Sequence, residues 1–412
     1  MIQIKGKYNS ANIFQSVIDE ATENQVKTIL DQPFVENETI RIMPDCHAGA
    51  GCVIGTTMTI NNGKVCPNLV GVDIGCGMYL MKLEGIKKSE IDFSALDSFI
   101  RKNIPSGLNV RDNKIVSYDN LKNLRCYREL KDGSRFEKAI GTLGGGNHFL
   151  EINEGKDGTL YFVVHTGSRN LGKQVAEYYQ NLANELCNND LASYFIEKAN
   201  LIEQYKKEGR KTEIQGALIA LKKKFSENKT EKVPKDLAYL EGSYLEDYLH
   251  DMDICQRYAH LNRETILRVV CKFFNLDFDS IEKFETIHNY IDLNQKILRK
   301  GSIDASKGKK VLIPINMRDG SIIAIGKGNE DYNCSAPHGA GRLMSRNEAR
   351  ASIDLKAFEQ SMEGIYTTCI NEQTIDESAF AYKSIENVLP WIEGTCDVVE
   401  IIKPIYNFKA SE

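Results

Sequence analysis

The sequence predicts a mixed α/β fold: a single large domain with mixed sheets and a helical insertion. Short apolar stretches broken by glycine fill residues 1–97 and return in 284–349, and this texture is typical of strands joined by tight turns. Between them, from about 171 to 274, the chain is charged, nearly free of proline and apolar at a spacing near 3.6, which predicts helices. We therefore interpret residues 1–412 as one domain with a helical excursion inside it.

The expected elements follow one another in a simple order. Strands and tight turns are predicted at residues 39–60, 66–83, 141–152 and 158–170. Residues 109–138 are polar and allow no assignment. Residues 247–274, DYLHDMDICQRYAHLNRETILRVVCKFF, predict one long helix.

Composition excludes several classes of protein. The formal net charge of −5 excludes a globally basic nucleic-acid binder, but not a local basic groove. No apolar run is long enough to span a bilayer and the N-terminus lacks the pattern of a signal peptide, so we expect no membrane contact and a cytoplasmic location. The 11 cysteines are scattered without a paired framework, which predicts reduced thiols.

Histidines in glycine-rich turns are the first sign of chemistry. Five of the seven histidines occupy such turns: His47, His148, His165, His288 and His338. His250 and His260 lie in the helical block and are interpreted as helix-face residues. A single turn histidine is usually structural, but five in similar settings indicate a shared site, because loops at strand ends hold functional groups on a rigid scaffold.

The segment VDIGCG places a carboxylate, Asp73, three residues before a thiol, Cys76. Its glycines allow a tight turn, so both side chains could point at one ion, and a thiolate can bridge two ions. Mixed sulfur, nitrogen and oxygen ligation suits zinc, cobalt or manganese, so the ligand types do not select the metal. Taken alone, the segment would be interpreted as a buried thiol and a turn cap. Cys46, beside His47, is interpreted as a packed thiol.

Small residues also cluster as GTLGGGNH, HTGSRNLG and HGAGR, loops that can present backbone N–H groups to phosphate oxygens. Arg169, Arg342 and Arg346 lie near these loops and could grip phosphates in a forked geometry, although each could equally form a structural ion pair. The P-loop signature is absent from the sequence, so a P-loop nucleotidase is not supported.

Taken together, these segments resemble the RtcB family of RNA ligases. The resemblance rests on MPDCHAGAG, VGVDIGCGM, GTLGGGNHFLEI, HTGSRNLG, HNY, GNE, HGAGRLMSR, AYKSIENV and a lysine near the end, in the family's order from Met43 to Lys409. It implies a GTP- and metal-dependent ligase that joins RNA 3′-phosphate or 2′,3′-cyclic phosphate ends to 5′-hydroxyl ends. The natural task, tRNA splicing or RNA repair, stays open.

The resemblance also implies catalytic and metal-binding residues. His338, in HGAGR, matches the histidine that takes GMP through a phosphoramidate bond, and Asp45 matches an acidic residue with a general-base role. The ligands implied for two manganese ions are a bridging Cys76, with Asp73 and His148 on one ion and His165 and His288 on the other.

A guanine-nucleotide site is implied as well, made of Asn147, His148, Phe149, Leu150, Glu151, His288, Asn289, Pro314, Ile315, Asn316, Met317, Ser321, His338, Gly339, Ala340, Gly341, Tyr382 and Lys409. Within it, Glu151 would accept the N1–H and the amine of guanine, which predicts a preference for GTP over ATP. This chain departs from the family at residues 314–318, with PINMR in place of PGSMG, and the pose of the nucleotide is in question there.

The implied reaction has three steps. His338 attacks the α-phosphate of GTP and pyrophosphate leaves; GMP passes to the RNA 3′-phosphate, giving an RNA-(3′)pp(5′)G end; the 5′-hydroxyl end then attacks and GMP departs. A local basic surface would hold the RNA, and its candidates are Arg169, Lys173, Arg342 and Arg346, with Asn262 and Arg263 as further ones.

Two other interpretations belong to different classes. A binuclear metallohydrolase, such as a phosphoesterase, would use the same histidine, aspartate and cysteine residues without a covalent histidine. A nucleic-acid-binding protein without catalysis would have no need of a metal-bridging thiolate. The sequence leaves open the oligomeric state and whether an activating protein partner is needed, as it is for some members of the family.

Overall fold

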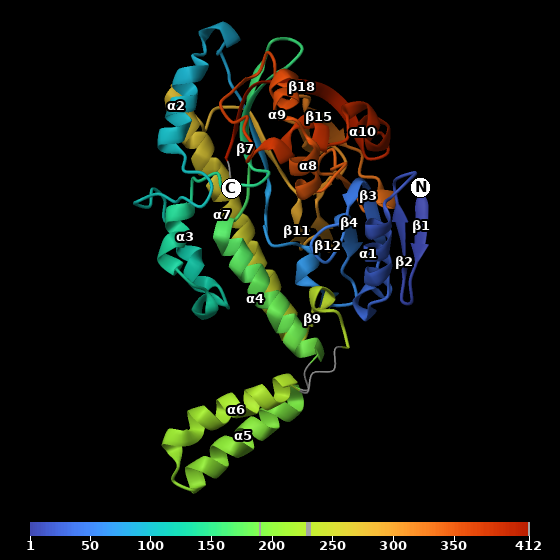
Figure 1. The fold of residues 1–412 in the computed structure, drawn as a ribbon, viewed down its shortest axis with the longest axis vertical. Coiled ribbons are helices and arrows are strands. Elements are labelled where there is room, and N and C mark those ends of the chain that lie inside the picture. Colours follow the sequence, from blue (N-terminus) through green and yellow to red (C-terminus); the bar gives the residue numbers. More distant parts are fainter. Residues whose placement is uncertain (189–190, 228–231, 411–412) are drawn as a thin grey trace.

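A computed structural model describes residues 1–188, 191–227 and 232–410 of the chain. Figure 1 shows a body of packed sheets and helices from which one helical hairpin extends. Within the described ranges, the body contains a six-stranded sheet, an eight-stranded sheet and two two-stranded ribbons. The mixed α/β class expected from the sequence is therefore confirmed.

The six-stranded sheet is built largely from the N-terminal part of the chain. Its strands are, in sheet order, β1 (Ile2–Lys5), β2 (Ser10–Ile13), β3 (Ile40–His47), β4 (Ile54–Thr59), β12 (Ile297–Lys300) and β11 (Asn289–Asp292). Helix α1 (Glu20–Leu30) contributes Val26, Ile29 and Leu30 to the same hydrophobic cluster as Ile13 and Ile42. The glycine-rich stretch 39–60 thus forms β3 and β4, as predicted.

The eight-stranded sheet carries the candidate site. Its strands are, in sheet order, β10 (Lys283–Ile287), β6 (Gly77–Lys82), β8 (Leu160–Thr166), β7 (Phe149–Glu154), β18 (Cys396–Lys409), β15 (Gly320–Gly326) and β14 (Lys310–Asn316), while β17 (Tyr366–Thr367) pairs with β18.

Both faces of this sheet are buried, because alternate side chains enter two different hydrophobic clusters. Leu150 and Phe162 pack in a cluster shared with helices α2 (Phe93–Asn103) and α7 (Gly242–Phe274). Their neighbours Phe149 and Val163 belong to a separate cluster with residues of β14 and β15. The sheet is therefore held rigidly from both sides, which suits a scaffold for a site at its edge.

Smaller elements complete the body. The two-stranded ribbons pair β5 (Lys64–Val65) with β9 (Leu240–Glu241) and β13 (Ser302–Asp304) with β16 (Ser335–Pro337). The remaining helices of the body are α3 (Gly133–Ala139), α8 (Arg346–Ser352), α9 (Leu355–Ser361) and α10 (Ile385–Ile392). Short 3-10 helices lie at Pro33–Val35, Pro67–Leu69, Lys88–Glu90, Asp119–Asn123, Tyr127–Glu129, Lys211–Glu213, Lys235–Leu237, Glu330–Tyr332, Ile375–Glu377 and Ala379–Ala381.

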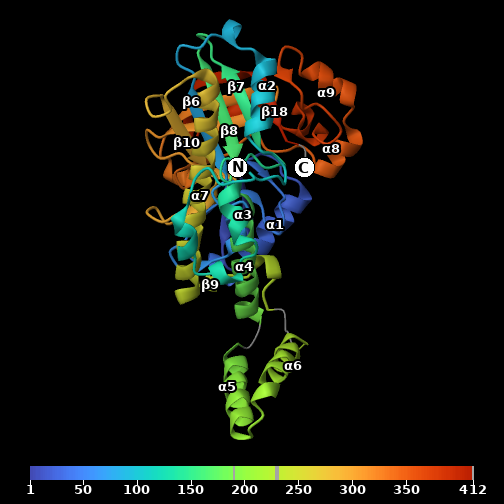
Figure 2. The same cartoon turned by 90° about the vertical axis from the view of Figure 1, so that its left-hand side faces the viewer.

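The helical block is only partly an excursion. It contains α4 (Arg169–Asn188), α5 (Leu191–Lys207), α6 (Ile214–Glu227) and α7. Figures 1 and 2 show α5 and α6 as a hairpin extending from the body, whereas α4 and α7 run along it. One face of α7 is fully buried, including Tyr248, Met252 and Cys255, so this helix is part of the core. The single long helix predicted at 247–274 lies within α7.

Two further observations concern the whole chain. All 11 cysteines fall in the described ranges and none forms a disulfide. Among the helices described, none combines the length and the apolar character needed to cross a membrane.

Candidate active site

Four neighbouring strands bring the candidate residues to one edge of the eight-stranded sheet. Strand β6 begins directly after Cys76 and β7 directly after His148. Strand β8 ends one residue beyond His165, and β10 ends one residue before His288. Because these strands are antiparallel neighbours, the starts of β6 and β7 lie beside the ends of β8 and β10. Side chains far apart in the sequence therefore converge.

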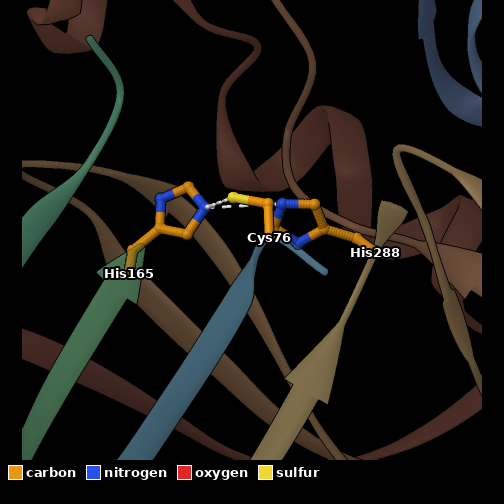
Figure 3. Close-up of side chains that lie close together, drawn as sticks. All are labelled: Cys76, His165 and His288. Carbon is orange, nitrogen blue, oxygen red and sulfur yellow. Dashed lines mark hydrogen bonds between the residues drawn. The ribbon is translucent and has the colours of Figure 1, made fainter. Parts of the chain in front are cut away.

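Cys76 lies at the centre of this cluster, and Figure 3 shows it between His165 and His288. Its Sγ is 3.4 Å from Nε2 of His165 and 3.6 Å from Nε2 of His148. Nε2 of His165 is 3.4 Å from Nε2 of His288, and Nε2 of His148 is 3.0 Å from Oδ2 of Asp73. Cys76 belongs to two groups of three whose ligand atoms all lie within 4.8 Å of one another, one with Asp73 and His148 and one with His165 and His288.

Backbone carbonyls orient two of the imidazoles. Nδ1 of His148 lies 3.0 Å from the carbonyl oxygen of Leu143, and Nδ1 of His165 lies 3.1 Å from that of Asn147. A carbonyl can only accept, so each Nδ1 carries a hydrogen. In His165 this leaves the lone pair of Nε2 facing Cys76, whereas Nε2 of His148 is also within hydrogen-bonding distance of the carboxylate of Asp73. Nδ1 of His288 is buried and has no hydrogen-bond partner among the described residues.

Burial keeps most of these donors uncharged in the protein alone. It lowers the pKa of His165 and of His288 well below the usual range, with neighbouring histidines adding to the effect. Burial, followed by the negative charge of Asp73, raises the pKa of the Cys76 thiol well above its usual range. Although burial opposes its ionisation, hydrogen bonding to His148 brings the pKa of Asp73 down to about 2. Imidazoles, a thiol and one carboxylate form a donor set that fits divalent cations, which bind imidazole and displace the thiol proton.

His338 lies beside this cluster and is held by Asp45. Oδ2 of Asp45 accepts a hydrogen bond from the backbone N–H of His338 at 3.0 Å and one from its Nδ1 at 2.6 Å. The ring centroid of His338 is 4.9 Å from that of His288. Gly341 makes this packing feasible, because a Cβ there would be 2.6 Å from the carbonyl oxygen of Asp45 and its φ is +77°.

A cavity of about 240 Å³ extends from His165 and His288 past His338 to Lys409 at the end of β18. Most residues expected around the nucleotide line it, namely Asn147, Phe149, Glu151, His288, Pro314, Ile315, Asn316, Met317, His338, Gly339, Ala340, Gly341, Tyr382 and Lys409. We call this space the first cavity. His47 and Arg342 also contribute to its wall.

Four residues expected around the nucleotide do not line the first cavity. Leu150 points to the opposite face of β7, because side chains alternate along a strand, and it packs in the core with α2 and α7. Ser321 is fully buried on β15. The side chain of Asn289 binds backbone groups of Asp73 and Gly301. His148 does not line the cavity but belongs to the group of metal-binding candidates, which we call the donor cluster: Asp73, Cys76, His148, His165 and His288.

Glu151 is buried within the wall of the first cavity. Its carboxylate accepts hydrogen bonds from Nδ2 of Asn407 at 2.6 Å and from Nδ2 of Asn153 at 3.2 Å. These amides are neutral, and burial raises the pKa of Glu151 to about 7. The group therefore changes charge near neutral pH, depending on what enters the cavity.

Glu377 is a buried carboxylate that sequence reasoning missed. It accepts hydrogen bonds from Nζ of Lys409 at 2.8 Å, from the hydroxyl of Tyr382 at 2.7 Å and from Nη1 of Arg346 at 2.5 Å. Burial alone would raise its pKa, but Lys409 and Arg346 bring it down to about 2. In TIDESAF, Glu377 has neither the glycines nor the histidine that marked the other turns, so only the hydrogen bonds reveal its position.

The basic residues proposed to bind RNA differ in their positions, contacts and exposure. Arg342 and Arg346 line the first cavity, but both contact Glu377. Lys173 is exposed on α4, and Arg169 is half-buried.

Asn262 and Arg263 were wrongly expected to face RNA, because both are fully buried on α7. Asn262 binds backbone groups of the 141–142 turn. Arg263 binds Glu285 and the carbonyl oxygens of Gly75 and Thr166, so it supports the Cys76 turn from behind.

The divergent segment 314–318 is well ordered by its own hydrogen bonds. Asn316 accepts backbone N–H groups from Arg318 and Asp319 and donates to the carboxylate of Asp319, which also pairs with Arg318. Pro314, Ile315 and Asn316 line the first cavity. The segment PINMR therefore forms part of the cavity wall in this chain.

Comparisons with known proteins find similar sequences over nearly the whole chain. The family model described as tRNA-splicing ligase RtcB matches residues 25–129 and 127–410. The RNA-splicing ligase RtcB of Escherichia coli K12 is 27% identical over 421 residues, covering 93% of this chain and 92% of that protein. The tRNA-splicing ligase RtcB of Thermococcus kodakarensis is 25% identical, covering 97% and 93%. That of Archaeoglobus fulgidus is 27% identical, covering 97% and 92%.

Proposed function

The chain belongs to the tRNA-splicing ligase RtcB family, and from this premise we propose that it joins RNA 3′-phosphate or 2′,3′-cyclic phosphate ends to 5′-hydroxyl ends, with GTP as co-substrate. Membership in the family supports RNA ligation as the activity. We propose a cytoplasmic enzyme that acts in tRNA splicing or RNA repair.

One observation carries the proposal: His338 stands between a carboxylate and the donor cluster on the wall of one cavity. Asp45 binds its Nδ1 at 2.6 Å, so the hydrogen sits on Nδ1 and the lone pair is on Nε2. His288, from the donor cluster, lies 4.9 Å away between ring centroids. A neutral imidazole held in this way is a competent nucleophile toward phosphorus.

We propose that the donor cluster holds two divalent cations, manganese by the family resemblance. Asp73 and His148 would bind one, His165 and His288 the other, and Cys76 would bridge them. Bound cations would neutralise phosphate oxygens and so make the phosphorus open to attack. The two triads that share Cys76, and the lone pairs aimed at it by backbone carbonyls, support this assignment.

His338 would perform the first step. Its Nε2 attacks the α-phosphorus of GTP and forms an N–P bond, while the bond from that phosphorus to the bridging oxygen breaks and pyrophosphate leaves. The imidazole becomes positively charged, and Asp45 stabilises that charge through Nδ1. A 2′,3′-cyclic phosphate end is first hydrolysed, with water breaking the bond from phosphorus to O2′ and leaving a 3′-phosphate. An oxygen of the RNA 3′-phosphate then attacks the GMP phosphorus, and the N–P bond breaks with its electron pair returning to Nε2.

In the last step the 5′-hydroxyl attacks the RNA phosphorus and GMP leaves. The hydroxyl proton would pass to Nε2 of His338, which the second step has freed. Asp45 takes part through His338, since its carboxylate is only 1% exposed and Oδ2 already binds Nδ1. We therefore assign the general-base role expected of Asp45 to the His338–Asp45 pair.

The experiment that tests this function is adduct trapping. The metal-loaded protein is incubated with GTP labelled at the α- or at the γ-phosphate, and RNA with 3′-phosphate and 5′-hydroxyl ends is then added. We expect label on the protein only from α-labelled GTP, its loss on addition of RNA, and none on His338→Ala. A phosphoesterase would release phosphate without labelling the protein, and an adduct on His338→Ala would contradict the assignment.

A further inference from the structure

We propose that a second cavity, on the far side of the His338–Asp45 pair, binds the terminal nucleoside of the RNA strand that carries the 5′-hydroxyl. This inference rests on the proposed ligase function. It assigns a role to the AYKSIENV motif, which the donor cluster and the first cavity leave largely unused.

The second cavity adjoins the reacting residues. Asp45 and Pro44 at the end of β3 form one side, and Lys383 with the residues of α10 forms another. Ala340 lines both cavities, and Asp45 is the carboxylate that binds His338. Each cavity has a volume of about 240 Å³.

The wall of the second cavity suits a flat aromatic base. Trp391, the only tryptophan of the chain, is half-buried there. Leu343 lies in the same wall and is 61% exposed, which is unusual for a large apolar side chain without a partner. Stacking on an aromatic side chain is the common way to bind the bases of single-stranded RNA, and it tolerates any base.

Polar groups in the same cavity match the rest of a nucleotide. Nζ of Lys383 donates to the carbonyl oxygen of Pro44 at 2.9 Å, which leaves further N–H groups of its ammonium for a phosphate of the chain. Asn387 is exposed at the cavity and offers a carboxamide to the edge of a base. One cation and one amide beside an aromatic ring favour a nucleoside with a single following phosphate.

The carboxylate of Asp45 selects the kind of end. A 5′-hydroxyl in the second cavity is uncharged, whereas a 5′-phosphate would add a charge of about −1.5 to −2 near this buried carboxylate. A hydroxyl bound there lies next to the His338–Asp45 pair, where the last step of the proposed reaction takes place. The position of the cavity thus agrees with a strand whose 5′ end is unphosphorylated.

Because Trp391 is the only tryptophan, its fluorescence reports on this cavity alone. The metal-loaded enzyme without GTP is titrated with a short 5′-hydroxyl RNA, with the same RNA carrying a 5′-phosphate, and with GTP. We expect the 5′-hydroxyl RNA to quench the emission, the 5′-phosphate form to bind more weakly, and GTP to leave the emission unchanged. Absence of quenching by the 5′-hydroxyl RNA would overturn the inference and leave the cavity to another occupant, such as a side chain of a protein partner.

Kinetics of the variants separate this site from the chemistry. Trp391→Leu should raise the KM for the 5′-hydroxyl strand about tenfold, as expected for one lost stacking contact, and should leave labelling by GTP unchanged. Lys383→Gln should raise the same KM less. Tyr244→Leu, which alters an exposed aromatic residue of α7, is the matched control and should change neither value.

These experiments distinguish failure of the second-cavity assignment from failure of the proposed ligase function. If the wild-type protein is not labelled by GTP, the ligase function fails. If labelling and ligation proceed but Trp391→Leu leaves the KM for the 5′-hydroxyl strand unchanged, only the second cavity loses its assignment. Circular dichroism and the melting temperature of Trp391→Leu show whether it is folded, and Trp391→Phe, which keeps a ring to stack on, should restore most of the affinity.

Discussion

The two ends of the first cavity handle charge in opposite ways. At the donor end, formed by Asp73, Cys76, His148, His165 and His288, burial favours the neutral forms of His165, His288 and Cys76. At the ion-pair end, formed by Arg342, Arg346, Glu377, Tyr382 and Lys409, a buried carboxylate stays ionised because cations surround it. Lone pairs face one another at the first end, whereas opposite charges meet at the second.

This difference in charge indicates which end of the first cavity needs a bound ligand to be stable. The donor end brings imidazole, thiol and carboxylate ligand atoms within 4.8 Å of one another in each of two groups of three, an arrangement that a bound cation would stabilise. The ion-pair end is already satisfied by its own side chains, so it contributes to the stability of the protein alone. A substitution at the donor end should therefore affect metal binding and activity, whereas one at the ion-pair end should first affect folding.

Removal of the shared thiol should have the largest effect. Cys76→Ala takes a ligand from both triads, and we expect metal affinity to fall more than about 100-fold, because even residues outside the ligand shell cost 10–100-fold. Ligation should be lost together with the metal. Metal content measured after gel filtration and ligation of labelled RNA are the readouts.

Cys255→Ala is the control for Cys76→Ala, because Cys255 is also buried but lies on α7 away from the cluster. It should retain metal and activity. The metal-free forms of both variants should unfold at similar temperatures, since neither loses an ion pair. Full metal occupancy in Cys76→Ala would contradict the two-ion arrangement.

Removal of the central carboxylate at the ion-pair end should destabilise the fold. Glu377→Ala removes the carboxylate that pairs with the buried Lys409, whereas Arg346 keeps its contact with Asp376. Breaking a buried pair such as Lys409–Glu377 costs about 3–5 kcal/mol. The low pKa of Glu377 sets the pH dependence: its contribution is fully present above about pH 4.5 and is lost as the pH falls toward 2. Urea unfolding at neutral and acid pH measures both.

Glu154→Ala provides the contrast for Glu377→Ala. Glu154 pairs with Lys88 at 2.9 Å, but the side chains are 32% and 49% exposed, so the loss should be at most about 1 kcal/mol. If Glu377→Ala costs no more than Glu154→Ala, the ion-pair end does not stabilise the protein as described.

Local patterns indicated which residues meet at the donor end, but they did not indicate Glu377 at the ion-pair end. Glycine turns that carry Cys76, His148 and His165 are visible in the sequence because the strand ends and the ligands lie next to each other. Glu377 gains its role from Lys409 and Arg346, which come from other elements, so no local pattern marks it.

The second limit of prediction from the sequence was the direction in which each side chain points. Leu150 shares a motif with Phe149 and Glu151, but strand alternation turns it into the core. Arg263 lies on a charged helix, and the sequence alone does not reveal that this face of α7 packs against the sheet. For the same reason, the block 171–274 could be predicted as helical, but not divided into two core helices and a projecting hairpin.

The smallest predicted effect concerns Glu151, a buried carboxylate of the same cavity whose hydrogen-bond donors are amides, whereas Lys409 and Arg346 bind Glu377 directly. Amide donors bind it, and its pKa is about 7. The N1–H and the amine of guanine both donate, so GTP should bind the ionised form, whereas N1 of adenine accepts and would favour the protonated form. Between about pH 6 and pH 8 the ionised fraction rises roughly tenfold, and the ratio of GTP to ATP affinity should rise by a similar factor or more.

Taking the ratio of the two affinities removes the pH dependence that both nucleotides share, since they carry the same triphosphate and meet the same donor end. Competition binding at the two pH values gives this ratio for the wild type and for Glu151→Ala. In the variant the ratio should be near one and should not change with pH, because no titrating group faces the base. A ratio that is independent of pH in the wild type would remove Glu151 as the group that reads the base, and a GTP preference retained in Glu151→Ala would move that role to another residue. Either result would leave the contrast with Glu377 standing, because that contrast rests on the neighbours of the two carboxylates: neutral amides around Glu151, and two cations that hold Glu377 ionised.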